Sequence, residues 1–414
     1  MGKFFNMKDK FCLVGNPLKH SFSQKIHALL GDYDYSLQEV NGDEFVKFVQ
    51  KGEFKGYNVT IPYKKDIIRL LDEIDERAKN IGAVNTVVVK NGKKVGYNTD
   101  FDGFIYMLNR AKISVKDKTI LILGSGGTSL TATAVVKRLG AKEIMFLSRE
   151  GRINYQNYQD FCGKVQVLIN TTPVGMYPNN YSCKINLDNF PALEGVVDVV
   201  YNPLTTKLIQ QAIDKKLKHT NGLPMLVAQA KFAMEKFLNQ QKDDDIIEQV
   251  INKIQLETQN IVLIGMPSCG KSTIGKILAE KLNRECVDID ERIEQKAKKD
   301  IKTIFSESGE DYFRKLESEV ILEVGCLTGK IICTGGGAVK LDENYFPLKQ
   351  NGKIFYLKRD LDKLLTENRP LSKDKQAIER LYQERKGQYE KFADITLDNN
   401  FDLQKTVEKL IGEL

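Results

Sequence analysis

An apolar run that leads into a glycine-rich loop is the feature that most constrains this sequence. Within Asn260–Thr273 the run is followed by Gly265-x-x-x-x-Gly270-Lys271-Ser272, the spacing of a P-loop, and apolar residues at helical spacing come next. Glycine backbone N–H groups can close around phosphates, the lysine can reach the outer phosphates, and the serine hydroxyl can ligate Mg²⁺. We therefore predict a nucleotide-binding domain that begins just before this run, and a different kind of domain ahead of it.

The composition limits the class of protein. The chain has 414 residues, of which 42% are hydrophobic and 28% charged, as in ordinary globular proteins. Its net charge of +7 contains no long block of one sign, which favours small anionic molecules over nucleic acid as partners. No run is long enough for a signal peptide or a membrane span, so we expect no membrane partner. The oligomeric state stays open between monomer and homodimer.

Cysteine and histidine usage indicates the compartment. The seven cysteines include no C-x-x-C pair, which favours reduced thiols in a cytoplasmic protein. The three histidines form no Cys/His cluster, and this argues against a structural zinc site.

Polar residues stand at the ends of the first predicted strands. Ser21 and Ser23 follow the strand Phe11–Gly15 and could both face an anion, although capping of a helix that begins near Gln24 explains them as well. Lys64 follows a short strand broken by proline, a place where lysine usually faces solvent.

A hairpin carries the next polar group. Strands Ala83–Val89 and Lys94–Tyr97 flank Asn91-Gly92, a strong turn signal, and the hairpin ends in an amide and a carboxylate, those of Asn98 and Asp100.

The segments GNPLKHSFS, NVTIPYK, GAVNTV and GYNTDFDG, in this order and spacing, resemble the substrate domain of the shikimate dehydrogenases. The resemblance implies that Lys64 and Asp100 form the catalytic pair. An ammonium group can stabilise and protonate the oxygen of a ketone that is being reduced, and a neighbouring carboxylate keeps the lysine charged. The resemblance also implies a carboxylate site at Ser21 and Ser23, and ring-hydroxyl contacts from Thr60, Asn85 and Asp100. Gln24 replaces the proline usual in the family.

A second glycine-rich loop predicts a βαβ unit. The buried strand Lys118–Gly124 runs into Gly124-Ser125-Gly126-Gly127-Thr128, where phosphate oxygens can meet the start of a helix. Ser129 replaces the third glycine of the dinucleotide pattern, so the bare motif is weak, but similar dehydrogenases often carry G-x-G-G-x-S.

The end of the next strand bears on the choice of cofactor. Glu143–Ser148 leads into Arg149-Glu150, and an arginine here suits the 2′-phosphate of NADP, whereas an acidic residue would bind the ribose of NAD. We therefore predict NADP(H), with Ser148 and Arg149 as contacts. Glu150 keeps NAD open, and a solvated loop arginine is the plain alternative for Arg149.

Later segments extend the same resemblance. The loops TTPVGMYPN and YNPLTT, which follow the predicted strands Val165–Asn170 and Val196–Tyr201, imply that Thr172, Met176 and Tyr201 lie near the nicotinamide and substrate. The stretch G-L-P-M-L-V-A-Q implies that Gln229 contacts a substrate hydroxyl, although by itself it reads as an amphipathic helix packed on a core.

Two carboxylates follow the P-loop helix. Asp288 and Asp290 end the apolar segment Cys286–Asp290, and we expect them on one side of a strand end. One of them could serve Mg²⁺ through water, and the other could accept the hydrogen bond of an acceptor hydroxyl.

The motifs D-x-D, G-E-x-x-F-R, G-G-G, N-R-P-L and a late R-x-x-x-Y, after this P-loop, resemble the shikimate kinases. The resemblance implies that shikimate is bound by Asp290, Arg314, Gly336, Gly337 and Arg385, with the arginines pairing with its carboxylate. Lys271, Asp290 and Arg369 would be catalytic, the lysine and Arg369 neutralising the transferring phosphoryl group. Ser272 would ligate Mg²⁺ directly and Asp288 through water. The implied ATP contacts are Gly265, Ser268, Cys269, Gly270, Lys271, Ser272, Thr273 and Arg369.

Cys269 departs from the small serine or glycine common in this loop. A helix N-terminus activates a nearby thiol towards oxidation, so we hypothesise that oxidation of Cys269 blocks ATP binding. Peroxide inactivation of the kinase would then be slower in Cys269→Ser, and an equal rate in the variant would contradict the hypothesis.

The two resemblances imply an α/β protein of several domains. The substrate-binding domain spans 1–110 and is completed by 220–240, a Rossmann NADP-binding domain spans 111–219, a helical linker spans 241–258, and a P-loop domain of the nucleoside monophosphate kinase type, with a parallel sheet, spans 259–414.

The implied activities are consecutive steps of chorismate and aromatic amino acid biosynthesis. NADPH would reduce 3-dehydroshikimate to shikimate, and Mg·ATP would convert shikimate to shikimate 3-phosphate. One alternative is a metabolite sensor built from inactive copies, which would need lost catalytic groups or an added DNA-binding element, and the sequence has neither. Another is a first domain that uses quinate and NAD, and Glu150 keeps this one open.

Overall fold

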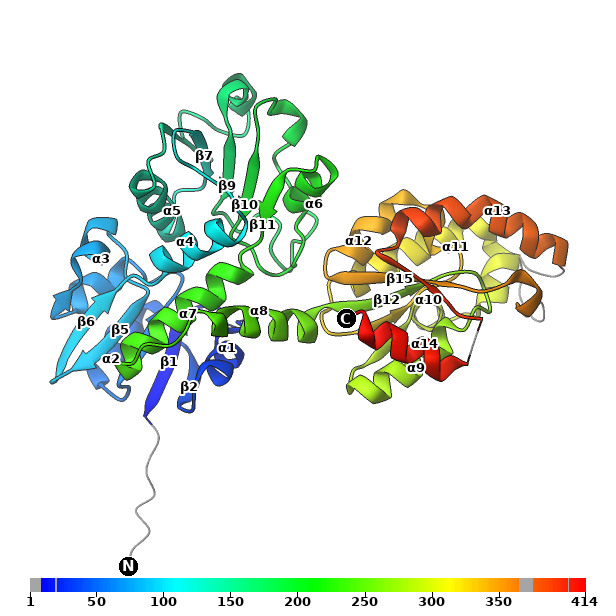
Figure 1. Cartoon of the computed structure of the whole chain (residues 1–414), viewed down its shortest axis with the longest axis horizontal. Helices are drawn as coiled ribbons and strands as arrows, with labels where there is room; N and C mark the ends of the chain where they lie inside the picture. The colour runs from blue at the N-terminus through cyan, green and yellow to red at the C-terminus, as the bar shows by residue number, and fades with distance from the viewer. Residues whose placement is uncertain (1–8, 19–20, 365–374, 401) are drawn as a thin grey trace, which may run out of the picture. The chain divides into compact units, whose positions relative to one another are not determined.

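The computed structural model describes residues 9–18, 21–364, 375–400 and 402–414. The chain divides into two compact units, Met1–Tyr201 with Thr206–Ile254 and Asn202–Thr205 with Gln255–Leu414, and Figure 1 draws both. The finer boundaries at residues 110, 219, 240 and 258 stay predictions. Arg369 and the rest of the N-R-P-L segment lie outside the described residues.

The first unit begins with a six-stranded sheet in the order β2-β1-β3-β5-β6-β4. Its strands are β1 Lys10–Gly15, β2 Asp34–Glu39, β3 Gly56–Val59, β4 Glu73–Ile74, β5 Thr86–Lys90 and β6 Lys93–Tyr97. The helices of this part are α1 Ser23–Leu30, α2 Gly42–Lys51, α3 Glu76–Ile81, α4 Asp100–Arg110 and, much later in the chain, α7 Leu223–Leu238. The predicted hairpin is confirmed, since β5 and β6 pair antiparallel around Asn91 and Gly92, both at positive φ.

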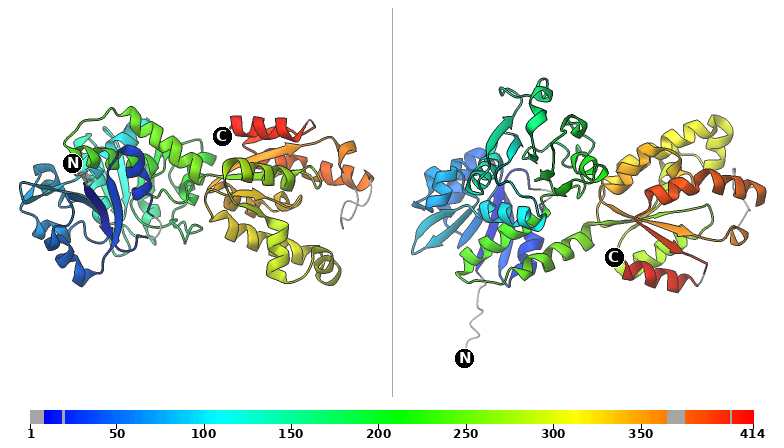
Figure 2. Two further views of the ribbon diagram at one scale, coloured as in Figure 1. Left: turned by 90° about the horizontal axis from the view of Figure 1, so that it is seen from below. Right: turned by 45° about the horizontal axis from the view of Figure 1, so that its top comes forward.

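Strand β1 is buried on both faces, which explains its unbroken apolar sequence. Phe11 and Leu13 join a cluster with Met234 of α7, whereas Cys12 and Val14 join a second cluster on the opposite face. Helix α7 therefore completes the core of a sheet that is formed more than a hundred residues earlier in the chain (Figures 1 and 2).

The second sheet of this unit is parallel, in the order β11-β10-β9-β7-β8. Its strands are β7 Thr119–Leu123, β8 Glu143–Leu147, β9 Val167–Asn170, β10 Gly195–Asp198 and β11 Lys218–Thr220, with helices α5 Gly127–Arg138 and α6 Lys207–Asp214. The four predicted strands of this sheet are all shorter than predicted. Strand β7 lacks one residue at each end, β8 ends at Leu147 and β9 begins at Val167. Strand β10 begins at Gly195 and ends at Asp198, because the Asp198 side chain accepts the backbone N–H of Val200 and turns the chain.

The second unit contains a five-stranded parallel sheet in the order β13-β14-β12-β15-β16. Its strands are β12 Asn260–Ile264, β13 Cys286–Asp288, β14 Ile331–Cys333, β15 Gly352–Lys358 and β16 Ile395–Asp398. Its helices are α9 Lys271–Leu282, α10 Ile289–Ala297, α11 Ile301–Gly325, α12 Tyr345–Lys349, α13 Lys375–Phe392 and α14 Leu403–Gly412. The central strands are buried on both faces, as expected of a parallel sheet covered by helices.

A further helix, α8 Asp245–Thr258, lies within the residues predicted as a helical linker. Just ahead of it, Asp244 accepts a hydrogen bond from the buried Lys231 of α7, whose ammonium also pairs with Glu235. No helix in the described ranges is both long enough and apolar enough to cross a membrane.

His27 is a buried imidazole in the first unit. Its ring stacks on Tyr35 with centroids 3.8 Å apart, and its Nδ1 lies 2.6 Å from the Tyr33 hydroxyl. Its Nε2 has no hydrogen-bond partner among the described residues. Burial lowers the pKa of His27 to about 3, so the folded protein holds this ring neutral.

We predict that the first unit loses stability as the pH falls from about 6.5 towards 3, because the unfolded chain protonates His27 near its ordinary pKa and the folded chain does not. The expected slope approaches about 1.4 kcal/mol per pH unit. Denaturant unfolding at several pH values measures it. His27→Gln should flatten the slope, whereas His219→Gln, at an exposed histidine, should not; an unchanged slope in His27→Gln contradicts the assignment.

Candidate functional site

Lys64 and Asp100 form a close ion pair in the first unit. Lys64 follows β3, Asp100 begins α4, and Lys64 Nζ donates to Asp100 Oδ2 at 2.6 Å. The two side chains are 15% and 7% exposed, so the pair is largely shielded and still reachable from one side. The structure thus brings together the two residues that were predicted to act as a pair.

Asn85 and Gln229, two further residues that were predicted to contact the substrate, bond to each other. Asn85 Nδ2 donates to Gln229 Oε1 at 3.3 Å and to Thr99 Oγ1 at 3.0 Å, while Asn85 Oδ1 accepts from the backbone N–H of Thr99, the residue before Asp100. Residues 144 positions apart in the chain are therefore neighbours. Helical periodicity of α7 indicated only core packing, because it contains no information about this distant amide.

The predicted carboxylate site lies on the turn before α1. Ser21 Oγ accepts from the backbone N–H of Ser23, which is buried as the first residue of α1. Phe22 stands between the two serines, and the centroid of its ring lies 5.3 Å from that of Tyr201. Thr60, directly after β3, is half-buried. Burial raises the pKa of Tyr201, so its hydroxyl is a hydrogen-bond donor at neutral pH. Phe22 was not singled out from the sequence, since an aromatic residue on a turn carries no local signal.

The glycine-rich loop between β7 and α5 approaches Lys64. A Cβ at Gly127 would lie 3.7 Å from the Lys64 side chain, and Gly124 has a φ of +109° that favours glycine. Ser125 and Gly126 are exposed, and Thr128 is half-buried in the first turn of α5. Ser129 donates its hydroxyl to the carbonyl of Gly124 at 3.0 Å, which accounts for a serine where the dinucleotide pattern has its third glycine.

Ser148 and Arg149 lie on the turn after β8. The backbone N–H of Ser148 donates to the carbonyl of Ile153 at 3.1 Å, and this bond closes the turn. Arg149 and Glu150 are both exposed, so each is free to meet a ligand from solvent.

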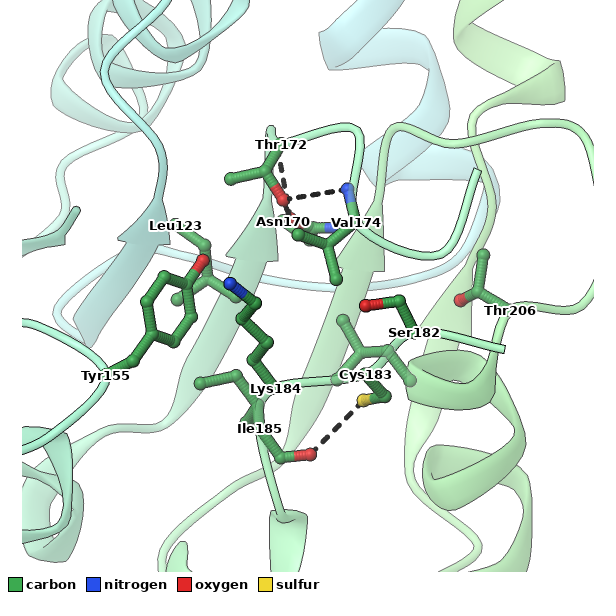
Figure 3. A pocket seen from close by; sticks show the side chains of 11 residues that line it. Leu123, Tyr155, Asn170, Thr172, Val174, Ser182, Cys183, Lys184, Ile185 and Thr206 are labelled. Atoms are coloured by element: carbon green, nitrogen blue, oxygen red, sulfur yellow. Dashed lines mark hydrogen bonds between the residues drawn. The ribbon is translucent and has the colours of Figure 1, made fainter. Parts of the chain in front are cut away.

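Thr172 is held by a chain of hydrogen bonds that begins at a buried carboxylate. Asp198 accepts from Asn170 Nδ2 at 2.9 Å and from the Thr206 hydroxyl at 2.7 Å, and Asn170 Oδ1 accepts from Thr172 Oγ1 at 2.6 Å. Figure 3 shows Asn170, Thr172 and Val174 along one wall of a cavity of about 20 Å³. Burial raises the pKa of Asp198 to about 6. Met176, on the same loop, is 41% exposed.

The P-loop has the backbone that its glycines require. Gly265 and Gly270 have φ values of +146° and +97°, and a Cβ at Gly265 would lie 2.6 Å from the carbonyl oxygen of Leu357. Ser268 also has a positive φ. Lys271 begins α9, and its Nζ donates to the carbonyls of Gly265 and Met266 at 2.9 Å each, so it is folded over the loop it belongs to.

Cys269 is fully buried, and its carbonyl accepts a hydrogen bond from Asn399 Nδ2 at 2.6 Å. Buried thiols react slowly with oxidants in solvent, so this burial argues against the oxidation hypothesis. Thr273 is exposed in the first turn of α9.

Asp288 and Asp290 do not share one side of a strand, so that expectation is wrong. Strand β13 ends at Asp288, whose side chain accepts the backbone N–H of Asp290 and caps α10, and Asp290 lies in the first helical turn. The two carboxylates have different neighbours. Asp288 Oδ2 accepts from Ser272 Oγ at 2.6 Å, whereas Asp290 Oδ1 would lie 2.8 Å from a Cβ at Gly335.

The pair of Ser272 and Asp288 offers oxygen donors that suit Mg²⁺. In the part of the chain that the structure describes, no three His, Cys, Asp or Glu side chains gather as a metal site. A cation held by Ser272 and Asp288 would therefore take most of its ligands from water and phosphate oxygens, as Mg²⁺ commonly does.

Two buried arginines meet the triple glycine. The Arg314 guanidinium occupies the space that a Cβ at Gly337 would fill, and it pairs with Glu317 at 2.6 Å. Arg385, only 2% exposed, donates through Nη1 to the carbonyl of Gly336 at 3.1 Å. Its Nε and Nη2 are buried without hydrogen-bond partners among the described residues. Such a group is suited to bind an anion that the chain itself does not supply.

Glu317 was missed from the sequence. It is fully buried, its Oε1 would lie 2.7 Å from a Cβ at Gly335, and burial raises its pKa against the opposing charge of Arg314. Its position three residues after Arg314 on α11 was the available signal, because residues at i and i+3 share one helix face.

Comparisons with known proteins cover both units. Residues 13–87 match the family profile described as "Shikimate dehydrogenase substrate binding domain", and residues 267–414 match the profile described as "Shikimate kinase". A "Shikimate dehydrogenase (NADP(+))" of Clostridium perfringens is 37% identical over 265 residues, which are 59% of this chain and 98% of that protein. One from Methanococcus maripaludis is also 37% identical, over 59% of this chain and 96% of that protein.

Solved structures agree with these relatives. The crystal structure of a chorismate mutase/shikimate 5-dehydrogenase fusion protein from Clostridium acetobutylicum has a TM-score of 0.57 and 31% identity, covering 60% of this chain and 97% of that one. The Thermus thermophilus shikimate 5-dehydrogenase in complex with NADP(H) and shikimate has a TM-score of 0.54 and 26% identity, covering 59% and 99%.

Fold and site together define the class as a dinucleotide-binding dehydrogenase fold followed by a P-loop kinase fold in one chain. The chain belongs to the shikimate dehydrogenase family, and it carries a shikimate kinase domain after the dehydrogenase part.

The contrast between the two buried arginines yields a prediction. Arg314→Met should destabilise the ligand-free second unit by about 3 kcal/mol, since it leaves the Glu317 carboxylate buried and unpaired. Arg385→Met should cost less than about 1 kcal/mol or raise the stability, because it removes two unsatisfied buried donors. Thermal unfolding without ligands measures both. Equal destabilisation by the two substitutions would contradict the view that Arg314, and not Arg385, is the direct ion-pair partner of Glu317.

Proposed function

We propose that the first unit reduces 3-dehydroshikimate to shikimate with NADPH and that the second unit phosphorylates the shikimate at its 3-hydroxyl with Mg·ATP. The observation that carries the first half is the Lys64–Asp100 pair beside a dinucleotide-binding loop. The second half rests on Arg385, a buried cation with two unpaired donors, beside the triple glycine in a unit with a P-loop. The family membership and the kinase domain support the same pairing of activities.

In the proposed reduction, NADPH supplies the hydride, and the chain supplies the proton and the orientation. Lys64 Nζ stabilises and protonates the developing alkoxide, and Asp100 keeps the ammonium charged and accepts from a ring hydroxyl. Asn85 and Gln229, already bonded to each other, offer the remaining amide contacts. Ser21, Ser23, Thr60 and Tyr201 are the proposed contacts of the carboxylate end of the substrate and of its nearest hydroxyls.

The cofactor contacts follow from the exposed loop atoms. Backbone N–H groups at the start of α5 suit the pyrophosphate, and Arg149 suits a 2′-phosphate. Thr172 and Met176 would border the nicotinamide. The curated relatives are named for NADP⁺, and the Thermus thermophilus structure contains NADP(H), which supports NADP over NAD for this chain.

In the proposed phosphorylation, one set of residues binds the acceptor substrate and another binds the phosphates and Mg²⁺. Arg314 and Arg385 bind the substrate carboxylate, and Asp290 accepts from the hydroxyl that attacks the phosphoryl group. Lys271 gives up its hydrogen bonds to the carbonyls of the P-loop and binds the outer phosphates instead. Ser272 ligates Mg²⁺ directly, and Asp288 does so through water. The same proposal assigns Gly336 and Gly337 to the substrate and Arg369 to the phosphoryl group.

Two crossed variants test the proposal in one chain. Lys64→Met should lower the rate of NADPH oxidation by 3-dehydroshikimate about a hundredfold or more, and leave phosphorylation of added shikimate unchanged. Lys271→Met should do the reverse. The measurements are nicotinamide absorbance, with NADPH and NADH compared, and product mass after Mg·ATP is added.

Each outcome has a clear reading. Loss of one activity without the other supports two independent sites. Reduction without phosphorylation in the parent protein confines the proposal to the first unit, and preferential oxidation of quinate with NAD⁺ replaces its substrate. Neither reaction, together with tight shikimate binding, contradicts the enzymatic proposal and favours a sensor.

A further inference from the structure

Arg359 is a cation beside the P-loop that lies outside the motifs named in the sequence analysis. It directly follows β15, and its Nη1 lies 3.9 Å from where a Cβ of Gly270 would be. Its Nε is buried and has no hydrogen-bond partner among the described residues. The side chain as a whole is half-buried, so solvent and a ligand can still reach the guanidinium.

The nearest carboxylate in sequence does not neutralise Arg359. Asp360 Oδ2 pairs with Lys363 at 3.2 Å, and Asp360 Oδ1 accepts from Asn400 Nδ2 at 2.8 Å. The backbone N–H of Asp360 also donates to Asn400 Oδ1 at 2.9 Å. These bonds fix the loop after β15 to the loop after β16. The guanidinium of Arg359 lies beside the P-loop, and no carboxylate of the described residues forms an ion pair with it.

The strand order decides which end of a nucleotide would meet this cation. The P-loop follows β12, the central strand. Three of the groups proposed to bind the acceptor, Asp290, Gly336 and Gly337, follow β13 and β14 on one side of it. Arg359 follows β15, on the other side. The terminal phosphate must face the acceptor, so the α-phosphate and the nucleoside must extend from the P-loop towards β15 and β16.

Asn399 holds the P-loop against the loop that follows β16. Asn399, just after β16, donates to the carbonyl of Cys269 at 2.6 Å and accepts from the buried Thr406 hydroxyl at 2.9 Å. Its Nδ2 also lies 3.1 Å from a Cβ at Gly270. The P-loop is therefore held against the loop after β16, which is bonded in turn to the loop that carries Arg359, so these parts are in place without a ligand.

We propose that Arg359 binds the α-phosphate of ATP from the β15 side of the P-loop. The inference rests on the proposed kinase function and adds a contact that the sequence motifs did not assign. A guanidinium is suited to this role because it presents planar donors to two phosphate oxygens, whereas Lys271 and the predicted Arg369 serve the outer phosphates. The α-phosphate keeps its charge throughout the reaction, so Arg359 contributes to nucleotide binding in ATP and ADP equally.

The test measures nucleotide affinity directly, in the full-length protein with Mg²⁺, by calorimetry for ATP and ADP and by competition for AMP and adenosine. Arg359→Met should weaken ATP, ADP and AMP by a common factor of about ten, and leave adenosine unchanged. Arg359→Lys should recover part of the lost affinity, since lysine restores the positive charge but not the two parallel donors of the guanidinium. Lys358→Met, at the exposed neighbouring position, should leave all four affinities as in the parent.

Three outcomes overturn the inference. Unchanged affinities in Arg359→Met remove the contact, a loss for adenosine as large as that for AMP assigns Arg359 to the base, and a loss confined to ATP assigns it to the terminal phosphate. Unchanged NADPH oxidation and an unchanged unfolding temperature exclude misfolding as the cause. If the parent binds ATP but forms no shikimate 3-phosphate, the proposed function fails while the Arg359 contact is still decided by the binding data.

Discussion

Both units depend on one constraint, that all strands of a parallel sheet end at the same edge. In the first unit the loop after β7, the turn after β8 and Asn170 at the end of β9 are brought together in this way. In the second unit the same rule brings together the P-loop, Asp288 and the triple glycine. The residues that carry the chemistry come from distant parts of the sequence, and sheet topology makes them neighbours.

Electrostatics divides the buried charges of this protein into two groups. Lys64 with Asp100, Arg314 with Glu317, and Lys231 with Glu235 and Asp244 each have an opposite charge within hydrogen-bonding distance. Arg385 and Arg359 have buried nitrogen atoms without such a partner among the described residues. Paired charges hold the fold and orient functional groups, whereas unpaired ones are costly unless an anion from outside the chain meets them. Arg385 and Arg359 are therefore the cations of the second unit that are best suited to meet an anion from outside the chain.

The sequence predicted the fold class and the local elements well because these depend on short-range patterns. The P-loop, the Asn91-Gly92 hairpin and the glycine-rich loop before α5 each formed where their residue types require a particular backbone. The placement of Asp290 on a strand failed, since Asp288 caps a helix and an alternating pattern over five residues cannot distinguish a strand end from a helix start.

The sequence by itself determined which groups are available: a lysine and a carboxylate after strand ends, two phosphate-binding loops, and a set of arginines, all fixed by residue type and short spacing. Only the tertiary structure decided which of them meet. The contact of Asn85 with Gln229, the burial of Glu317 against Arg314, the inaccessibility of Cys269 and the position of Arg359 beside Gly270 all join elements far apart in the chain. These contacts arise from packing and strand order, which depend on the whole chain rather than on any local stretch.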